Sequence, residues 1–315
     1  MARALPDCEI VEARAESGAL SELWSRLTCK PERSQLEALD AVRGDRDLAF
    51  ALPVSDGSRA WGTLAVGPRG EVEGDLRLPH AAVQGAAALL LPGREAPGPG
   101  VLSRDGELFH ARARPDGGLD LASLVSSDGQ AQRLFRLKSR LFGGAVLDGT
   151  WEAAVYLPGQ DQPVPRAALA VGFSRRAPAV AAIEGFVSDL QSAWPVRRSF
   201  FAVDGAQGAC LLDLNVLPAF APCYVATDRA LVVGWNPASV RQALGGTLGP
   251  PSDPVASLLV DFERVAQADA MLARSAGGGE PALPRHYPWR RLTVRGETDR
   301  EAVHLRATLE PGADG

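Results

Sequence analysis

Apolar residues alternate one by one with polar or small residues in several short segments of this 315-residue chain. These segments lie at residues 48–54, 72–78, 169–173, 231–235, 258–262 and 303–309. Successive residues of a strand point to opposite faces, so a period of two predicts strands with one buried and one solvated face. Antiparallel sheets have such faces, whereas the strands of parallel sheets are continuous apolar runs. The pattern therefore favours antiparallel sheets and disfavours a doubly wound nucleotide-binding fold.

Helical stripes, in which apolar residues recur every three or four positions, are fewer than the strand segments. The clearest stripe covers residues 179–194, and shorter ones lie at 20–27 and 36–42. Asn236 followed by Pro237 predicts a helix start, and Gly245 predicts its end after about two turns. A further helix carrying Leu272 is expected after the strand at 258–262. We predict the α+β class, with curved antiparallel sheets covered on one face by helices.

A strand, a short polar turn and a helix recur in that order at residues 9–24, 107–124 and 257–272. Because the offsets between the copies are unequal, this recurrence predicts an internal duplication that has diverged. Breaks rich in proline and glycine lie at residues 92–100 and 245–254. We therefore predict two related α+β halves, residues 1–100 and residues 101–315, which either stay separate or share one continuous domain. Pairing of the final strands with the first ones is an open alternative.

Composition narrows the class of partner before any site is considered. With 46% hydrophobic and 23% charged residues, the chain has the composition of a folded soluble protein. Its formal net charge is −5, from 33 basic and 38 acidic residues. Nucleic acid is not an expected partner, because binding to phosphates needs a basic face. No run of 18 apolar residues is present, so no membrane-spanning helix is expected.

The four cysteines are candidate disulfide partners. Cys8 opens a predicted strand and Cys29 closes the predicted helix that returns along it. Cys210 and Cys223 lie in two consecutive apolar strands, at positions that can face each other. Two local bridges, Cys8 with Cys29 and Cys210 with Cys223, are therefore feasible. The alternative is four buried thiols in a reducing cytosol, and both interpretations stay open.

Two segments are candidate interaction surfaces. The basic one, residues 133–142, has the pattern of an amphipathic helix that packs its leucines on the protein or, as the weaker alternative, lies on an anionic membrane. The aromatic one, residues 285–291, combines aromatic residues with arginines, as binding hot spots do, and its alternative is a strand entry with a buried tryptophan. The candidate residues are Arg133, Arg136, Arg140, Arg285, His286, Tyr287 and Trp289.

The segment from residue 222 to residue 244 contains Asp228-x-x-Leu-Val-Val-Gly234, followed by Pro237-x-x-Val240. With the strand–turn–helix units, it resembles a diffuse group of bacterial proteins of unknown function, over residues 149–309. The resemblance implies an extracytoplasmic location behind a signal peptide or anchor, and no assigned activity. The sequence starts without a recognisable leader. The expected location is therefore the periplasm or cell envelope if a leader has been removed, and the cytoplasm otherwise.

The search for chemistry finds no nucleophile elbow, phosphate-binding loop or zinc-binding motif, and the four histidines are scattered singly. We therefore expect no cofactor, no metal ion and no catalytic residue. The favoured hypothesis is a non-catalytic cell-envelope binding or scaffolding protein with a protein partner. One alternative is a periplasmic carrier that holds a lipophilic ligand in an apolar cavity. The other is an enzyme whose active site is assembled from residues far apart in the sequence.

Overall fold

The computed structural model describes residues 41–53, 59–80, 91–95, 97–115, 147–159, 164–213, 221–248, 256–275 and 287–312. The chain forms two compact units. Unit 1 consists of Met1–Gln84 together with Pro288–Gly315, and unit 2 consists of Gly85–Tyr287. The sequence analysis predicted a boundary between two halves at residue 100, whereas unit 1 combines residues from both ends of the chain.

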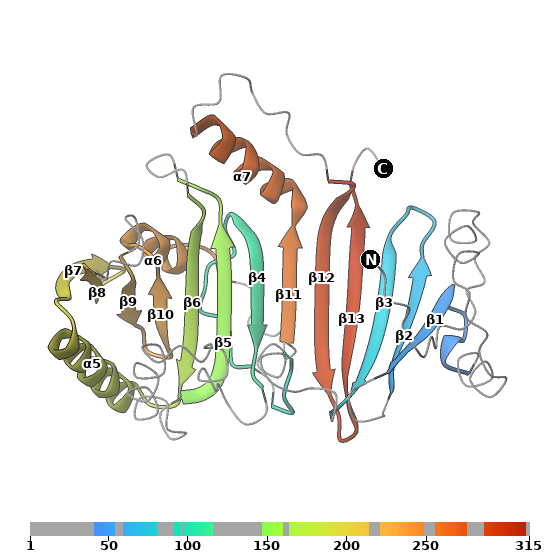
Figure 1. Cartoon of the computed structure of the whole chain (residues 1–315), viewed down its shortest axis with the longest axis horizontal. Helices are drawn as coiled ribbons and strands as arrows, with labels where there is room; N and C mark the ends of the chain where they lie inside the picture. Colours follow the sequence, from blue (N-terminus) through green and yellow to red (C-terminus); the bar gives the residue numbers. More distant parts are fainter. Residues whose placement is uncertain are drawn as a thin grey trace. The chain divides into compact units, whose positions relative to one another are not determined.

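Unit 1 holds an antiparallel sheet with the strand order β1–β2–β3–β13–β12 (Figure 1). Its strands are β1 (Leu48–Pro53), β2 (Arg59–Val66), β3 (Val72–Pro79), β12 (Trp289–Thr298) and β13 (Ala302–Pro311). β13 pairs with β3 from Ala302 opposite Pro79 to Leu309 opposite Val72. The last strands of the chain therefore pair back with early ones, the alternative that the sequence left open.

The two faces of the unit 1 sheet differ as the alternation predicts. Leu305 lies opposite Leu76 on one face, while Arg306 lies opposite Asp75 on the other. The Asp75 carboxylate accepts hydrogen bonds from Arg306 Nε at 3.0 Å and from Arg46 Nη2 at 2.9 Å. The polar face is thus held by ion pairs between side chains of neighbouring segments.

The strands of unit 2 are also antiparallel, in the order β11–β4–β5–β6–β10–β9–β8–β7 (Figure 1). Its strands are β4 (Glu107–Ala113), β5 (Leu147–Tyr156), β6 (Arg166–Phe173), β7 (Arg197–Val203), β8 (Ala206–Leu212), β9 (Cys223–Ala226), β10 (Ala230–Gly234) and β11 (Ala256–Asp261). Its described helices are α5 (Arg176–Ala193), α6 (Pro237–Leu244) and α7 (Phe262–Ser275). These helices confirm the predicted stripe at 179–194, the two-turn helix after Asn236 and the helix carrying Leu272.

The predicted α+β class, with helices on one face of the sheets, is wrong. Strands hold 50% of the described residues and helices only 22%, so antiparallel sheet dominates the fold. In unit 2 the helices also lie on both faces. Val240 of α6 packs in one cluster with Val232 of β10, while Val187 of α5 packs in another with Leu231. Residues 231 and 232 are neighbours in a strand, so α5 and α6 cover opposite faces.

Small residues explain why the sequence pattern was misleading. In β6 the residues that alternate with Leu169 and Val171 are alanines and a glycine, which the period-two pattern assigns to solvent. In the structure Ala168 and Ala170 are buried in the same cluster as Val240. Small side chains allow α6 to approach the sheet closely, so this face is packed rather than solvated.

The start of α6 follows its predicted cap. Asn236 Oδ1 accepts hydrogen bonds from the Ser239 backbone N–H at 2.8 Å and from Ser239 Oγ at 3.0 Å. Pro237 occupies the first turn, and the Gly245 N–H donates to Arg241 O at 2.8 Å at the other end. The helix is therefore bounded by local chemistry that is visible in the sequence.

Replacing Asn236 by alanine is expected to lower the free energy of unfolding by about 1 kcal/mol, because the buried Ser239 N–H loses its acceptor. Asn236→Ser is the matched control, since a serine side chain can accept the same bond. The measurement is urea denaturation of both variants beside the wild type. Equal midpoints for the two variants would show that the cap contributes nothing.

Cys210 of β8 lies directly opposite Cys223 of β9, and the two form a disulfide. This bridge confirms one of the two predicted pairs. Cys8 and Cys29 lie outside the described residues. None of the described helices combines the length and the apolar character that crossing a membrane requires.

The predicted duplication stays a prediction. Its second and third copies supply β4 and β11, which pair antiparallel with Ser257 opposite Arg112. The first copy lies outside the described residues.

Candidate functional site

Charged side chains are buried in the middle of the unit 2 sheet. His110 and Arg112 project from β4, and Glu152 lies opposite Arg112 on β5, so all three share one face. His110 is 2% exposed and Glu152 is 4% exposed. The His110 Nε2 and Glu152 Oε1 atoms are 2.8 Å apart. We call these three residues the buried polar cluster.

The segment at residues 97–102 is attached to this cluster. The backbone N–H groups of Val101 and Leu102 donate to Glu152 Oε2 at 2.7 Å and 3.3 Å. Arg112 Nη2 donates to Pro97 O at 3.1 Å. A segment that the sequence marks as part of a break is therefore fixed to the sheet by two charged side chains.

The surroundings of Glu152 favour its ionised form. Burial alone would raise the pKa of this carboxyl group, but the hydrogen bonds from His110 and Val101 and the positive charge of Arg112 together hold it below its ordinary value. Glu152 is therefore a fixed anion that organises three segments. It is not poised to exchange a proton near neutral pH.

A small cavity lies beside the cluster. Its volume is about 110 Å³, and its lining includes Asp148, Thr150, Glu152 and Arg229. A cavity for a lipid or other large ligand has a volume of several hundred Å³. This cavity therefore lends no support to the lipophilic carrier.

Glu152 lines this cavity, but the other two members of the cluster do not reach it. His110 Nδ1, the ring nitrogen that does not face Glu152, is buried without a hydrogen-bond partner in the described part of the chain. A general base must lie within hydrogen-bond reach of its substrate, and neither His110 nor Arg112 lines the cavity. The geometry supports a structural role for the cluster, which joins the loop at 97–102 to the sheet.

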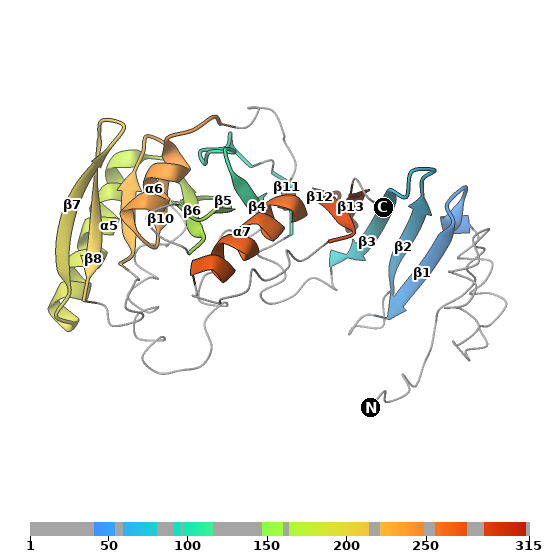
Figure 2. The ribbon, with the colours of Figure 1, turned by 90° about the horizontal axis from the view of Figure 1, so that it is seen from above.

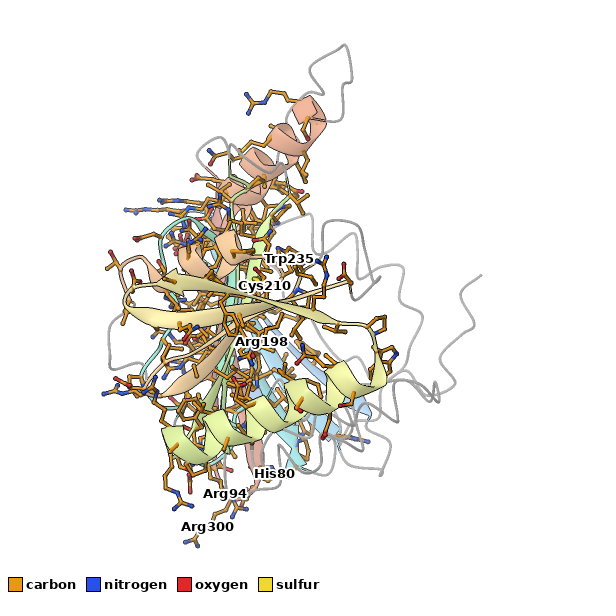
Figure 3. The ribbon with its side chains drawn as sticks, turned by 90° about the vertical axis from the view of Figure 1, so that its left-hand side faces the viewer. His80, Arg94, Arg198, Cys210, Trp235 and Arg300 are labelled. Carbon is orange, nitrogen blue, oxygen red and sulfur yellow. A yellow bond between two sulfur atoms is a disulfide. The ribbon has the colours of Figure 1, made fainter. Side chains whose placement is uncertain are left out.

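Among the described residues of unit 2, the most exposed large apolar side chain lies at the outer strand of the sheet. β7 ends the strand order, and Figure 2 shows it outside β8. Phe200, in the middle of β7, is 58% exposed. The Arg198 guanidinium stacks 4.8 Å from the Phe200 ring and donates to both oxygens of Glu184 on α5 at 2.6 Å. Figure 3 labels Arg198 between the β7–β8 hairpin and α5.

The hydrogen-bond pattern shows which backbone groups of β7 face outward. Ser199 lies opposite Cys210 on β8. The next residue of β8, Leu211, donates its N–H to Pro222 O at 2.8 Å, on the side away from β7. Because backbone groups alternate in direction along a strand, Cys210 faces β7 and bonds Ser199. The N–H and C=O groups of Arg198, Phe200 and Ala202 therefore point away from β8, and we call these three residues the β7 edge.

The residues predicted as the aromatic surface are only partly described. Tyr287 packs its ring against Phe262 of α7, with ring centroids 5.7 Å apart, and its hydroxyl donates to Asp269 Oδ2 at 3.2 Å. Trp289 is half-buried at the start of β12. Arg285, His286, Arg133, Arg136 and Arg140 lie outside the described residues. Whether these side chains form an interaction surface stays a prediction.

The sequence analysis missed both the buried polar cluster and the β7 edge. A local signal for the hairpin exists: the strand segment that contains Arg198 and Phe200 ends at Asp204-Gly205, a dipeptide typical of two-residue hairpin turns. No local signal marks Glu152. Comparisons of this chain with protein-family models, with curated proteins and with solved structures found no match.

Proposed function

We propose that this chain is a non-catalytic binding or scaffolding protein of the cell envelope, and that the β7 edge is its contact surface. The observation that carries the proposal is the outward-facing strand edge with Phe200 58% exposed and Arg198 stacked on its ring. Aromatic and arginine side chains dominate the binding energy of protein interfaces. A strand edge adds backbone groups that a partner strand can pair with.

Two further features support this proposal. The Cys210–Cys223 disulfide is typical of proteins in oxidising compartments, in agreement with a location outside the cytoplasmic membrane. That location is also the one implied by the resemblance to the diffuse bacterial group. The buried polar cluster uses its charges to hold the loop at 97–102, which leaves the exposed edge as the stronger candidate for function.

Replacing Phe200 by a photo-crosslinking phenylalanine analogue tests the contact surface. In cells that produce the protein naturally, we expect irradiation to give discrete covalent adducts, because a partner strand would cover the ring. Val66 is the matched control: it is 50% exposed and apolar, but it lies in unit 1. Electrophoresis of the envelope fraction reads out both variants. An absence of adducts at position 200, or the same adducts at both positions, would refute the proposal.

A further inference from the structure

We infer that the partner at the β7 edge is a second copy of this chain, joined by antiparallel pairing of β7 with itself about a two-fold axis at Phe200. This inference rests on the proposed function, because it takes the β7 edge to be the contact surface. It goes further by naming the partner and the register of the pairing.

The direction of the backbone groups permits this axis. A two-fold axis through a pair of antiparallel strands sets one residue opposite its own copy. If that residue has outward-facing N–H and C=O groups, the two copies exchange both hydrogen bonds. Phe200 is such a residue and is also the midpoint of Arg197–Val203. Arg198 then lies opposite Ala202 of the partner subunit, and the three resulting pairs form roughly six backbone hydrogen bonds.

The charges of β7 favour this register over the one with the axis at Arg198. With Phe200 at the axis, Arg197 lies opposite Val203 of the partner subunit, and no arginine faces an arginine. Moving the axis by two residues to Arg198 would place the two Arg198 side chains directly opposite each other, and like charges in that position are destabilising. Arg197 and Arg198 already have their own partners in Asp213 and Glu184. They therefore remain paired at the two ends of the symmetric interface.

The side chains of the edge also favour self-pairing. Opposed residues in antiparallel strands point to the same face, so the two exposed Phe200 rings would meet as a cross-strand aromatic pair. Strand edges that must stay single are usually interrupted by proline, by charged side chains such as lysine, or by a bulge. β7 contains neither proline nor lysine, its two arginines are held in ion pairs with Asp213 and Glu184, and its pairing with β8 runs from Arg197 to Val203 without a register shift. The edge thus retains the regular geometry that a second strand needs.

Sedimentation equilibrium of the full chain, with its disulfides intact, is the first test. We expect a wild-type species of twice the 33.2 kDa chain mass at about 100 µM. Phe200→Asp is expected to weaken dimerisation at least tenfold, because two carboxylates would face each other at the axis. Val66→Asp, at a similarly exposed position of unit 1, is expected to leave the dimer intact.

Mixing Phe200→Asp with Phe200→Arg distinguishes loss of the interface from loss of folding. If Phe200 faces its own copy, the mixture regains the dimer as a heterodimer, although Phe200→Asp alone is monomeric. A monomeric wild-type chain, a dimeric Phe200→Asp variant or a mixture without dimer would each overturn the inference. A monomeric wild type whose position 200 crosslinks to other proteins would remove only this inference, whereas a lack of any adduct at position 200 would remove the proposed function as well.

Discussion

Replacing Glu152 by alanine is expected to lower the free energy of unfolding by about 3–5 kcal/mol, the usual cost of removing one member of a buried charged pair. The substitution removes the carboxylate that His110 Nε2 contacts and that accepts hydrogen bonds from the Val101 and Leu102 N–H groups. The Arg112 guanidinium would also lose the buried negative charge that lies opposite it. The measurement is urea denaturation at pH 7.

Glu152→Gln separates the charge from the hydrogen bonds. The amide oxygen keeps one acceptor, so the expected loss at pH 7 is smaller, about 1–3 kcal/mol. The folded-state pKa of Glu152 lies below the ordinary value of 4.5, so its contribution to stability is present above about pH 4.5 and declines as the pH falls below that value. The stability difference between the wild type and Glu152→Gln should therefore narrow as the pH falls below 4.5.

Glu107 is the matched control for this pH dependence. It is also a buried glutamate of unit 2, but burial raises its pKa, and the charges of Arg104 and His110 offset this only in part. The sign is therefore opposite: its contribution to stability is present below about pH 4.5 and is lost as the pH rises through the raised pKa. Glu107→Gln should gain stability relative to the wild type as the pH rises toward 7. The same pH trend for both variants would contradict the assigned roles.

Removing the Cys210–Cys223 bridge is expected to lower the free energy of unfolding by about 3 kcal/mol. The two cysteines are separated by 13 positions, and a crosslink across a loop of this length restricts the unfolded chain by about that amount. The test is guanidinium denaturation of a Cys210→Ala, Cys223→Ala double variant. Alanine keeps these sites small and apolar, so the comparison isolates the covalent bond from the packing.

Alkylation of the denatured chain without reductant provides the control for this comparison. Peptide mass analysis should show Cys210 and Cys223 unmodified in the wild type, because a disulfide does not react with the alkylating reagent. Alkylation of both residues, together with a double variant that unfolds at the wild-type midpoint, would show that the disulfide does not form. The argument for an oxidising compartment would then fail as well.

Features set by neighbouring residues were predictable from the sequence. The alternation at 303–309 marks β13, and Asn236, Pro237 and Gly245 mark the ends of α6. Cys210 and Cys223 were recognised because they lie in consecutive strands. The predicted fold class was wrong because the alternation assigned the alanines and the glycine of β6 to a solvated face. The hydrophobicity of such small residues does not show whether a helix covers them.

The candidate sites depended on contacts between distant residues. His110 and Glu152 are 42 positions apart, and they meet only because β4 pairs with β5. Glu152 is buried because the loop at 97–102 lies over it and donates backbone N–H groups. In the sequence it is one glutamate among many.

The sequence by itself determined where strands and one capped helix form and which cysteines of unit 2 can pair, because these depend on alternation, capping and spacing along a short stretch of chain. Only the tertiary structure decided the order of the strands. That order makes β7 an edge with Phe200 exposed, whereas β10 is enclosed between α5 and α6. Strand order depends on which segments, far apart in the sequence, pack together to bury their apolar faces. No local pattern carries that information.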